Sequence, residues 1–170
     1  NEKVYPDYYL QNFHHQTDGY LSDHSAGIYD IQVESSDLHG CELDESIAEL
    51  MIDEYPILAI AASFAKSPSI FRGLGELKVK ESNRLELIRL NLRKCGCECE
   101  VINDDLLIKP SKIYNPTENK IRTDFDHRIA MAFCVMGSRL GNLVIEDSDS
   151  INTSFPNFVD TFNSVGGNIL

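Results

Sequence analysis

Apolar and polar residues alternate in blocks that predict strands and helices in succession along the chain. In residues 29–34, Tyr29, Ile31 and Val33 alternate with polar side chains, which is typical of a half-buried strand. The stretch PILAIAASFA at 56–65 starts with a proline and is apolar nearly all round, so it predicts a buried helix. Residues 69–74 then predict a short strand.

A second helix is predicted by an apolar stripe in the middle of the chain. Leu85, Ile88 and Leu92 fall on one helical face. Ser82 is a suitable N-terminal cap, and the helix is expected to run to Cys95, where a glycine follows after basic residues in the last turn.

A hairpin, a third helix and a further strand follow. Residues 97–102 alternate and residues 106–110 return after an Asn-Asp turn, which predicts a β-hairpin. The apolar run after Asp126 predicts a helix that ends near Gly141, and residues 143–147 predict a strand.

The last predicted helix completes a layered arrangement. Pro156 is expected to open this helix, and Gly166 and Gly167 to close it. The order strand, helix, strand, helix, hairpin, helix, strand, helix predicts an α/β or α+β domain with buried helices. No linker divides the chain, so residues 1–170 are expected to form a single domain, with 1–26 irregular or a partial unit.

Composition restricts where the protein is expected to act. With 170 residues, of which 42% are hydrophobic, the chain is long enough for one globular core. It contains no apolar stretch of bilayer-spanning length and no signal-peptide pattern at its start, so no membrane partner is expected. Its five cysteines are an odd number without framework spacing, which favours reduced thiols and a cytoplasmic location.

Two groups of residues resemble metal ligands only weakly. The run C-x-C-x-C at 95–99 lacks paired C-x-x-C spacing, and small apolar residues at a helix end and along a strand explain it better. Near the start, three histidines and two aspartates could hold an ion, but loop histidines without helical spacing are usually solvated. These residues are His14, His15, His24, Asp18 and Asp23. Neither group is therefore expected to be a metal site.

Charge argues against a nucleic-acid partner but leaves room for a small anion. The net charge of −12 is opposite to that of a phosphate-binding face. A local group of cations can still hold an anion, because salt screens charges farther away than about 8 Å. The stretch KVKESNR at 78–84 is such a group, with two lysines and an arginine around one glutamate.

Charged residues gather at the starts of three predicted helices. Helix N-termini carry unpaired N–H groups and a positive partial charge, so anions bind there. If the three ends converge, the cations form a clamp for phosphate or carboxylate. The residues are Asp53 and Glu54 at the first helix, Lys80, Glu81 and Arg84 at the second, and Asp126, His127 and Arg128 at the third.

A structural explanation exists for each of these stretches taken alone. Asp126 can simply cap its helix, Lys78 and Lys80 can be solvated, and Arg84 can pair with Glu81 three residues before it. Their combination favours a site, because Arg128 adjoins a helix that must be buried. A buried guanidinium needs an anionic partner.

The stretches IDEYPILAIAASFA, ELKVKESNRLELI, DHRIAMAF and SFPNF closely resemble the C-terminal half of 5-enolpyruvylshikimate-3-phosphate (EPSP) synthases, in order from Ile28 to Gly166. The resemblance implies transfer of the enolpyruvyl group of phosphoenolpyruvate to the 5-hydroxyl of shikimate 3-phosphate, with release of phosphate and without a metal or organic cofactor. It also implies the two-domain enolpyruvyl transferase fold, in which βαβαββ units repeat and the active site lies between the domains.

The resemblance assigns roles to six residues. Asp53 corresponds to an aspartate that contacts shikimate 3-phosphate and is a candidate base, and Lys80 to a lysine near both substrates. Glu81 corresponds to a glutamate that moves a proton at the methylene carbon of phosphoenolpyruvate. The residues that correspond to phosphoenolpyruvate ligands are Lys80, Arg84, His127 and Arg128.

Three departures from the family pattern qualify these roles. Thr153 stands where many members carry a phosphoenolpyruvate-binding lysine, and Asn83 replaces a common aspartate, which is a minor change. The family's N-terminal domain has no counterpart in these 170 residues. The chain is therefore expected to be the C-terminal domain, with the N-terminal domain of the same polypeptide as its partner, and to be inactive alone.

Two alternatives remain at this point. The same fold could transfer enolpyruvate to a UDP-sugar, although the sister enzyme that does so lacks the KESNR and DHRIAMAF stretches. The chain could also be a non-catalytic anion-binding or scaffold domain. Loss of function usually erodes charged site residues, and nearly all of them are present.

Overall fold

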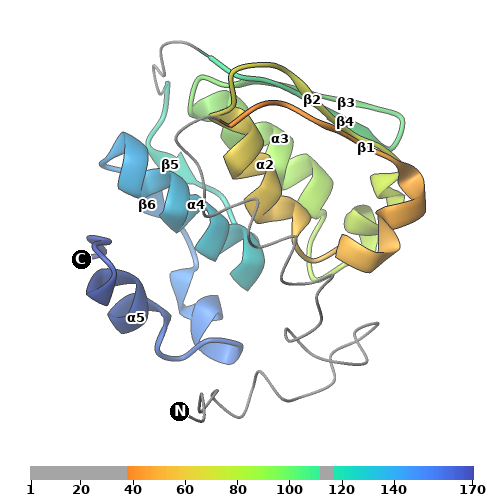
Figure 1. Cartoon of the computed structure of the whole chain (residues 1–170). Helices are drawn as coiled ribbons and strands as arrows, with labels where there is room; N and C mark the ends of the chain where they lie inside the picture. Colours follow the sequence, from red (N-terminus) through yellow and green to blue (C-terminus); the bar gives the residue numbers. More distant parts are fainter. Residues whose placement is uncertain (1–37, 112–116) are drawn as a thin grey trace, which may run out of the picture. The chain divides into compact units, whose positions relative to one another are not determined.

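A four-stranded sheet packs against two helices in the structure, a computed structural model that describes residues 38–111 and 117–170 (Figure 1). Leu38–Leu170 belong to one compact unit. The strand predicted at 29–34 and the histidines near the start lie outside the described residues. Among the helices of the described part, none is long and apolar enough to cross a membrane.

The sheet combines parallel and antiparallel strands in the spatial order β1-β2-β4-β3. β1 runs parallel to β2, whereas β4 is antiparallel to both of its neighbours. β5 and β6 form a separate parallel pair. The bounds are β1 Glu42–Leu43, β2 Ser69–Phe71, β3 Glu98–Ile102, β4 Asp105–Lys109, β5 Lys120–Ile121 and β6 Val144–Ile145.

Helices connect these strands. α2 and α3 contact the four-stranded sheet, and α4 packs against α2. The α-helices are α2 Tyr55–Ser63, α3 Arg84–Lys94, α4 His127–Leu140 and α5 Phe158–Ser164. Short 3₁₀ helices lie between them: η3 Glu45–Ile47, η4 Glu49–Met51, η5 Leu74–Val79 and η6 Ser148–Thr153.

The order of elements contains the expected βαβαββ unit. β1, α2, β2, α3, β3 and β4 follow one another in this order, and β5, α4, β6 and α5 repeat its first four elements. In each case a helix connects two neighbouring parallel strands, β1 to β2 and β5 to β6. This mixed α/β arrangement confirms the predicted fold class.

The predicted buried helix at 56–65 is confirmed as α2. Pro56 lies in its first turn, where its missing N–H costs no intrahelical hydrogen bond. Tyr55, Ala59 and Ile60 are almost completely buried. The Tyr55 ring packs on Phe71 of β2 at a centroid distance of 5.5 Å, which ties the helix to the sheet.

The predicted second helix is confirmed as α3, but its predicted cap is wrong. Leu85, Ile88 and Leu92 are buried as expected, and each buried side chain of this kind contributes about 1.5–3 kcal/mol. The side chain of Asn83, not Ser82, caps the helix by accepting a hydrogen bond from the Glu86 N–H at 3.1 Å. The Ser82 hydroxyl is already used, because it donates to a carboxylate on another element.

The predicted hairpin is confirmed as β3 and β4. Asn103 in its turn has a φ of 58°, a left-handed conformation that asparagine tolerates well. Cys95 and Cys99 are buried at the end of α3 and in β3, which confirms their interpretation as small apolar residues. Burial raises the pKa of Cys99 to about 12, with the neighbouring Cys97 adding to the effect.

The end of the chain forms a second, smaller core around α4. Ala130 and Cys134 of α4 cluster there with Ile151 and Phe158, and α4 thereby links this cluster to the first core. The last helix begins at Phe158, so the prediction that Pro156 opens it is wrong. The Phe158 N–H donates to the carbonyl of residue 155, which places the proline in a turn before the helix.

Candidate functional site

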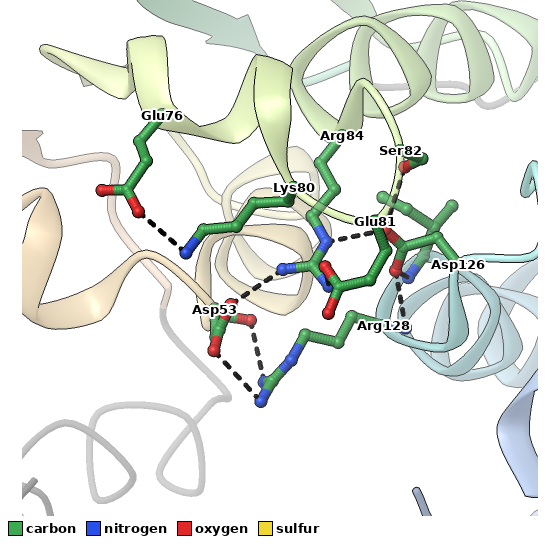
Figure 2. Close-up of polar contacts among 9 residues, drawn as sticks. Asp53, Glu76, Lys80, Glu81, Ser82, Arg84, Asp126 and Arg128 are labelled. Atoms are coloured by element: carbon green, nitrogen blue, oxygen red, sulfur yellow. Dashed lines mark hydrogen bonds and ion pairs between the residues drawn. The ribbon is translucent and has the colours of Figure 1, made fainter. Parts of the chain in front are cut away.

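The starts of α2, α3 and α4 converge on one cluster of charges (Figure 2). Asp53 lies two residues before α2, Arg84 is the first residue of α3, and Arg128 is the second residue of α4. Asp53 contacts both arginines. The structure therefore brings together three of the residues predicted from sequence. In the chain, Asp53 is 31 positions from Arg84 and 75 positions from Arg128.

Arg84 is the centre of the cluster and its side chain is fully buried. Its Nε donates to Asp126 at 2.7 Å, Nη1 to Asp53 at 2.8 Å and Nη2 to Glu81 at 2.5 Å. Burial by itself would lower the pKa of Arg84, but the hydrogen bond and charge of Asp126, helped by Glu81 and Asp53, raise it above its ordinary value. The predicted ion pair between Arg84 and Glu81 is present, as one of three ion pairs that Arg84 makes.

Asp126 is the buried anion that Arg84 requires. Its Oδ2 accepts from Arg84 and from the Ser82 hydroxyl at 2.9 Å, while Oδ1 accepts from the Arg128 and Ile129 N–H groups. It thus caps α4 and fixes Arg84 with one side chain. Burial alone would raise the pKa of Asp126, but Arg84 outweighs it and the pKa lies below the ordinary value.

This second role of Asp126 was not predicted from the sequence. Asp126 and Arg84 are 42 residues apart, so no local spacing relates them. The requirement for an anion could have been found only by recognising that Arg84 is buried. Burial was instead expected for Arg128, whose side chain is 29% exposed while that of Arg84 is 0% exposed.

Asp53 joins the two arginines. Its Oδ1 accepts from Arg84, its Oδ2 lies 3.4 Å from Nη2 of Arg128, and its main-chain carbonyl accepts from Nη1 of Arg128 at 3.1 Å. The neighbouring Glu54 has a raised pKa because it is desolvated, with Arg128 opposing and Asp53 reinforcing the shift. Two carboxyl groups with different environments therefore adjoin at the start of α2.

The lysines of the KVKESNR stretch have separate partners. Nζ of Lys80 lies 2.9 Å from Glu76, so Lys80 is ion-paired and the alternative of a merely solvated side chain does not describe it. Lys78 contacts Asp104 at 2.6 Å and the carbonyl of Asn103 at 3.2 Å, which ties it to the hairpin turn. Lys80 remains the lysine of this stretch that belongs to the predicted site.

His127 and Thr153 complete the predicted positions. Burial lowers the pKa of His127 below its ordinary value although Asp126 opposes the shift, so the imidazole is mostly neutral near pH 7. The Thr153 hydroxyl donates to the Ser150 carbonyl at 2.7 Å within η6. In residues 38–111 and 117–170, no group of three His, Cys, Asp or Glu side chains is placed to hold a metal ion.

The cluster has the components for binding an anion and moving protons beside it. Arginine forks bind carboxylate and phosphate through paired hydrogen bonds. Arg128 and Lys80 are partly exposed, at 29% and 22%, so an anion can reach them. The partly exposed carboxylates of Asp53 and Glu81 lie on the same arginine and can exchange protons with a bound molecule.

Sequence comparison relates the chain to one family. The model of the family described as EPSP synthase (3-phosphoshikimate 1-carboxyvinyltransferase) matches residues 24–162. A protein of Paramagnetospirillum magneticum named 3-phosphoshikimate 1-carboxyvinyltransferase is 44% identical over 143 residues, which cover 84% of this chain and 32% of the relative. A Campylobacter jejuni protein of the same name is 43% identical over 142 residues, with the same coverage.

A solved structure agrees with this relation. The EPSP synthase of Acinetobacter baumannii superposes with a TM-score of 0.70 at 33% sequence identity, over 78% of this chain and 31% of that one. The chain spans about a third of the length of the curated relatives it matches.

Proposed function

Because the chain belongs to the EPSP synthase family, we propose that the polypeptide carrying it transfers the enolpyruvyl group of phosphoenolpyruvate to the 5-hydroxyl of shikimate 3-phosphate, releasing phosphate. The observation that carries the proposal is the meeting of Arg84, Arg128 and Asp53 at three helix starts. Helix starts and arginines both favour a ligand with carboxylate and phosphate groups.

The cations of the cluster bind phosphoenolpyruvate in this proposal. Arg84 and Arg128 hold its anionic groups, with Lys80 and the neutral His127 beside them. Fixed arginines also stabilise charge that builds up during addition, because they need no reorganisation at the moment of reaction. The burial of Arg84 and its attachment to Asp126 support such a fixed position.

The carboxylates move the protons. Addition of the 5-hydroxyl to phosphoenolpyruvate requires a proton at the methylene carbon and the removal of another from the hydroxyl. We assign the first to Glu81 and the second to Asp53, which also binds shikimate 3-phosphate together with Lys80. Elimination of phosphate from the adduct then returns a proton from the methyl carbon to the protein.

The rest of the site is proposed to come from elsewhere in the same polypeptide. The chain covers about 32% of its curated relatives, so it supplies one wall of the active-site cleft and an N-terminal domain supplies the facing wall. Localisation in the cytoplasm is part of the proposal, supported by buried free cysteines that no disulfide uses within residues 38–111 and 117–170.

The test is an assay on the natural polypeptide that contains this chain. Phosphate release should require both phosphoenolpyruvate and shikimate 3-phosphate, and mass spectrometry should detect EPSP as the product. UDP-N-acetylglucosamine serves as the competing acceptor. Phosphate release from phosphoenolpyruvate with UDP-N-acetylglucosamine as the only acceptor would contradict the proposal. Phosphate release from phosphoenolpyruvate without any acceptor would contradict it as well.

A further inference from the structure

Each nitrogen of the Arg84 guanidinium donates to a carboxylate of the protein itself (Figure 2). The side chain is also fully buried, so solvent does not reach it from another direction. These bonds use three of the five N–H donors of the guanidinium and one on each nitrogen. A ligand anion that binds the same side of one of these nitrogens therefore takes the place of a carboxylate.

The balance of charge also requires a replacement. Arg84 and Arg128 contribute two positive charges, whereas Asp53, Glu81 and Asp126 contribute three negative charges when ionised. Lys80 does not change this balance, because its charge is paired with that of Glu76. A ligand that carries a carboxylate and a phosphate meets an excess of negative charge in this arrangement. Moving one carboxylate away removes both the repulsion and the steric block.

Of the three carboxylates, Glu81 is the least restrained. Asp126 is fully buried and accepts from two side chains and two N–H groups. Asp53 is shared by both arginines and is 37% exposed. Glu81 is 52% exposed, and its one ion pair within the described part of the chain is with Arg84. Its longer side chain can swing into solvent without movement of the main chain.

We propose, building on the proposed function, that the Glu81 carboxylate occupies the position on Arg84 that an anionic group of phosphoenolpyruvate takes, and that binding of this ligand displaces Glu81. The displacement couples binding to chemistry. A carboxylate paired with Arg84 is held away from the reacting carbon by that contact, whereas a released carboxylate can turn toward the bound ligand. Glu81 thus becomes available for proton transfer only when the ligand is in place.

The test compares affinities for phosphoenolpyruvate, measured calorimetrically on the natural polypeptide without shikimate 3-phosphate, so that no turnover takes place. Glu81→Gln removes the competing charge, so the Kd should fall by about threefold or more. Glu86→Gln is the matched control, because Glu86 pairs with Arg89 at the same i,i+3 spacing on α3 and is 43% exposed. This control should leave the Kd unchanged.

A crystal structure of the wild-type polypeptide with phosphoenolpyruvate alone gives a second readout that does not depend on a variant. Glu81 should lie beyond hydrogen-bonding distance of Arg84, with a ligand oxygen in its place. An unchanged or higher Kd in Glu81→Gln would overturn the proposal that the ligand displaces Glu81. A Glu81–Arg84 pair that persists in the complex would overturn it as well. If the wild type forms EPSP and only these results fail, the proposed function stands. If phosphoenolpyruvate does not bind at all, both proposals fail.

Discussion

Asp126 ties the charged cluster to the interior of the protein. Its carboxylate holds Arg84 and the first N–H groups of α4 at the same time. Arg84 has two other anionic partners, but Asp53 and Glu81 are partly exposed and their interactions are screened by water. The position of Arg84 therefore depends mainly on one buried residue.

Asp126→Asn should lower the free energy of unfolding by about 3 kcal/mol. The amide keeps the cap but leaves the guanidinium of Arg84 without its buried counter-charge, and removal of one member of a buried pair is strongly destabilising. Denaturant unfolding measures the change. Asp124→Asn removes an exposed carboxylate paired with Arg122 two residues away, and should cost no more than about 1 kcal/mol. Equal losses in the two variants would contradict this account.

Acid should destabilise the wild type through the same residue. Because the folded pKa of Asp126 lies below its ordinary value, its contribution is complete above the unfolded pKa of about 3.9. The contribution is lost as the pH falls through the lower folded pKa. Below about pH 4 the free energy of unfolding should therefore fall less steeply with decreasing pH in Asp126→Asn than in the wild type. Parallel pH profiles would show that the pKa of Asp126 is not lowered by folding.

Arg128 is the more accessible of the two arginines and gives a test of ligand binding. Arg128→Lys in the natural polypeptide keeps the charge but loses the fork, so KM for phosphoenolpyruvate should rise by about tenfold, the equivalent of one charge-assisted hydrogen bond. Arg139→Lys on the exposed end of α4 is the control and should leave KM unchanged. A wild-type KM in Arg128→Lys would remove this residue from the binding site.

At the scale of elements, the starts of the helices determine where the charged side chains lie. Asn83 and Asp126 each accept a main-chain hydrogen bond in the first turn, at α3 and α4 respectively. The two caps fix the main chain on either side of Arg84 and Arg128. α5 begins differently, because Asn157 makes no capping hydrogen bond with its side chain.

This difference between two asparagines predicts a difference in stability. Asn83→Ala should lower the free energy of unfolding by about 1 kcal/mol, because the first turn of α3 loses its capping acceptor. Asn157 occupies the same N-cap position on α5 but makes no such bond. Asn157→Ala should therefore change the free energy of unfolding by less than half as much. Thermal and denaturant unfolding of both variants check the prediction, which fails if the order of the two effects is reversed.

At the scale of the whole described unit, each part of the cluster lies between a strand and the helix that follows it. Asp53 lies between β1 and α2, Lys80 and Glu81 lie between β2 and α3 with Arg84 as the first residue of α3, and Asp126 lies between β5 and α4 with Arg128 in the first turn of α4. Helices that connect parallel strands start at the carboxyl edge of the strands, which is where ligands bind in α/β folds. Thr153 occupies the corresponding segment between β6 and α5, without a positive charge.

The 170-residue chain alone should show no turnover. In the proposed function this chain supplies one wall of the active-site cleft, and a single wall cannot exclude water or orient two substrates. Phosphate release from the purified chain with both substrates should equal the background, whereas the natural polypeptide serves as the positive control. Turnover by the isolated chain at a comparable rate would show that this wall suffices.

Local patterns predicted most elements of the described part. The apolar runs of α2, the stripe of α3 and the alternation in β3 and β4 depend on side chains close together in sequence, so their periods are readable. The two-residue strands β1 and β5 and the short 3₁₀ helices were not predicted, because segments this short carry no period. Local sequence did not distinguish Ser82 from Asn83 as the cap of α3. Only the tertiary structure shows that the Ser82 hydroxyl donates to Asp126 and is not available for capping.

The sequence by itself determined which charged residues lie at the helix starts, because KESNR and DHRIAMAF contain arginines, a lysine and carboxylates at predicted helix starts. Only the tertiary structure decided how these charges are paired. Arg84, and not Arg128, is fully buried, and Asp126 is its interior partner. Burial and ion pairing arise from contacts between segments tens of residues apart, and their energies depend on distance and desolvation, which no local pattern specifies.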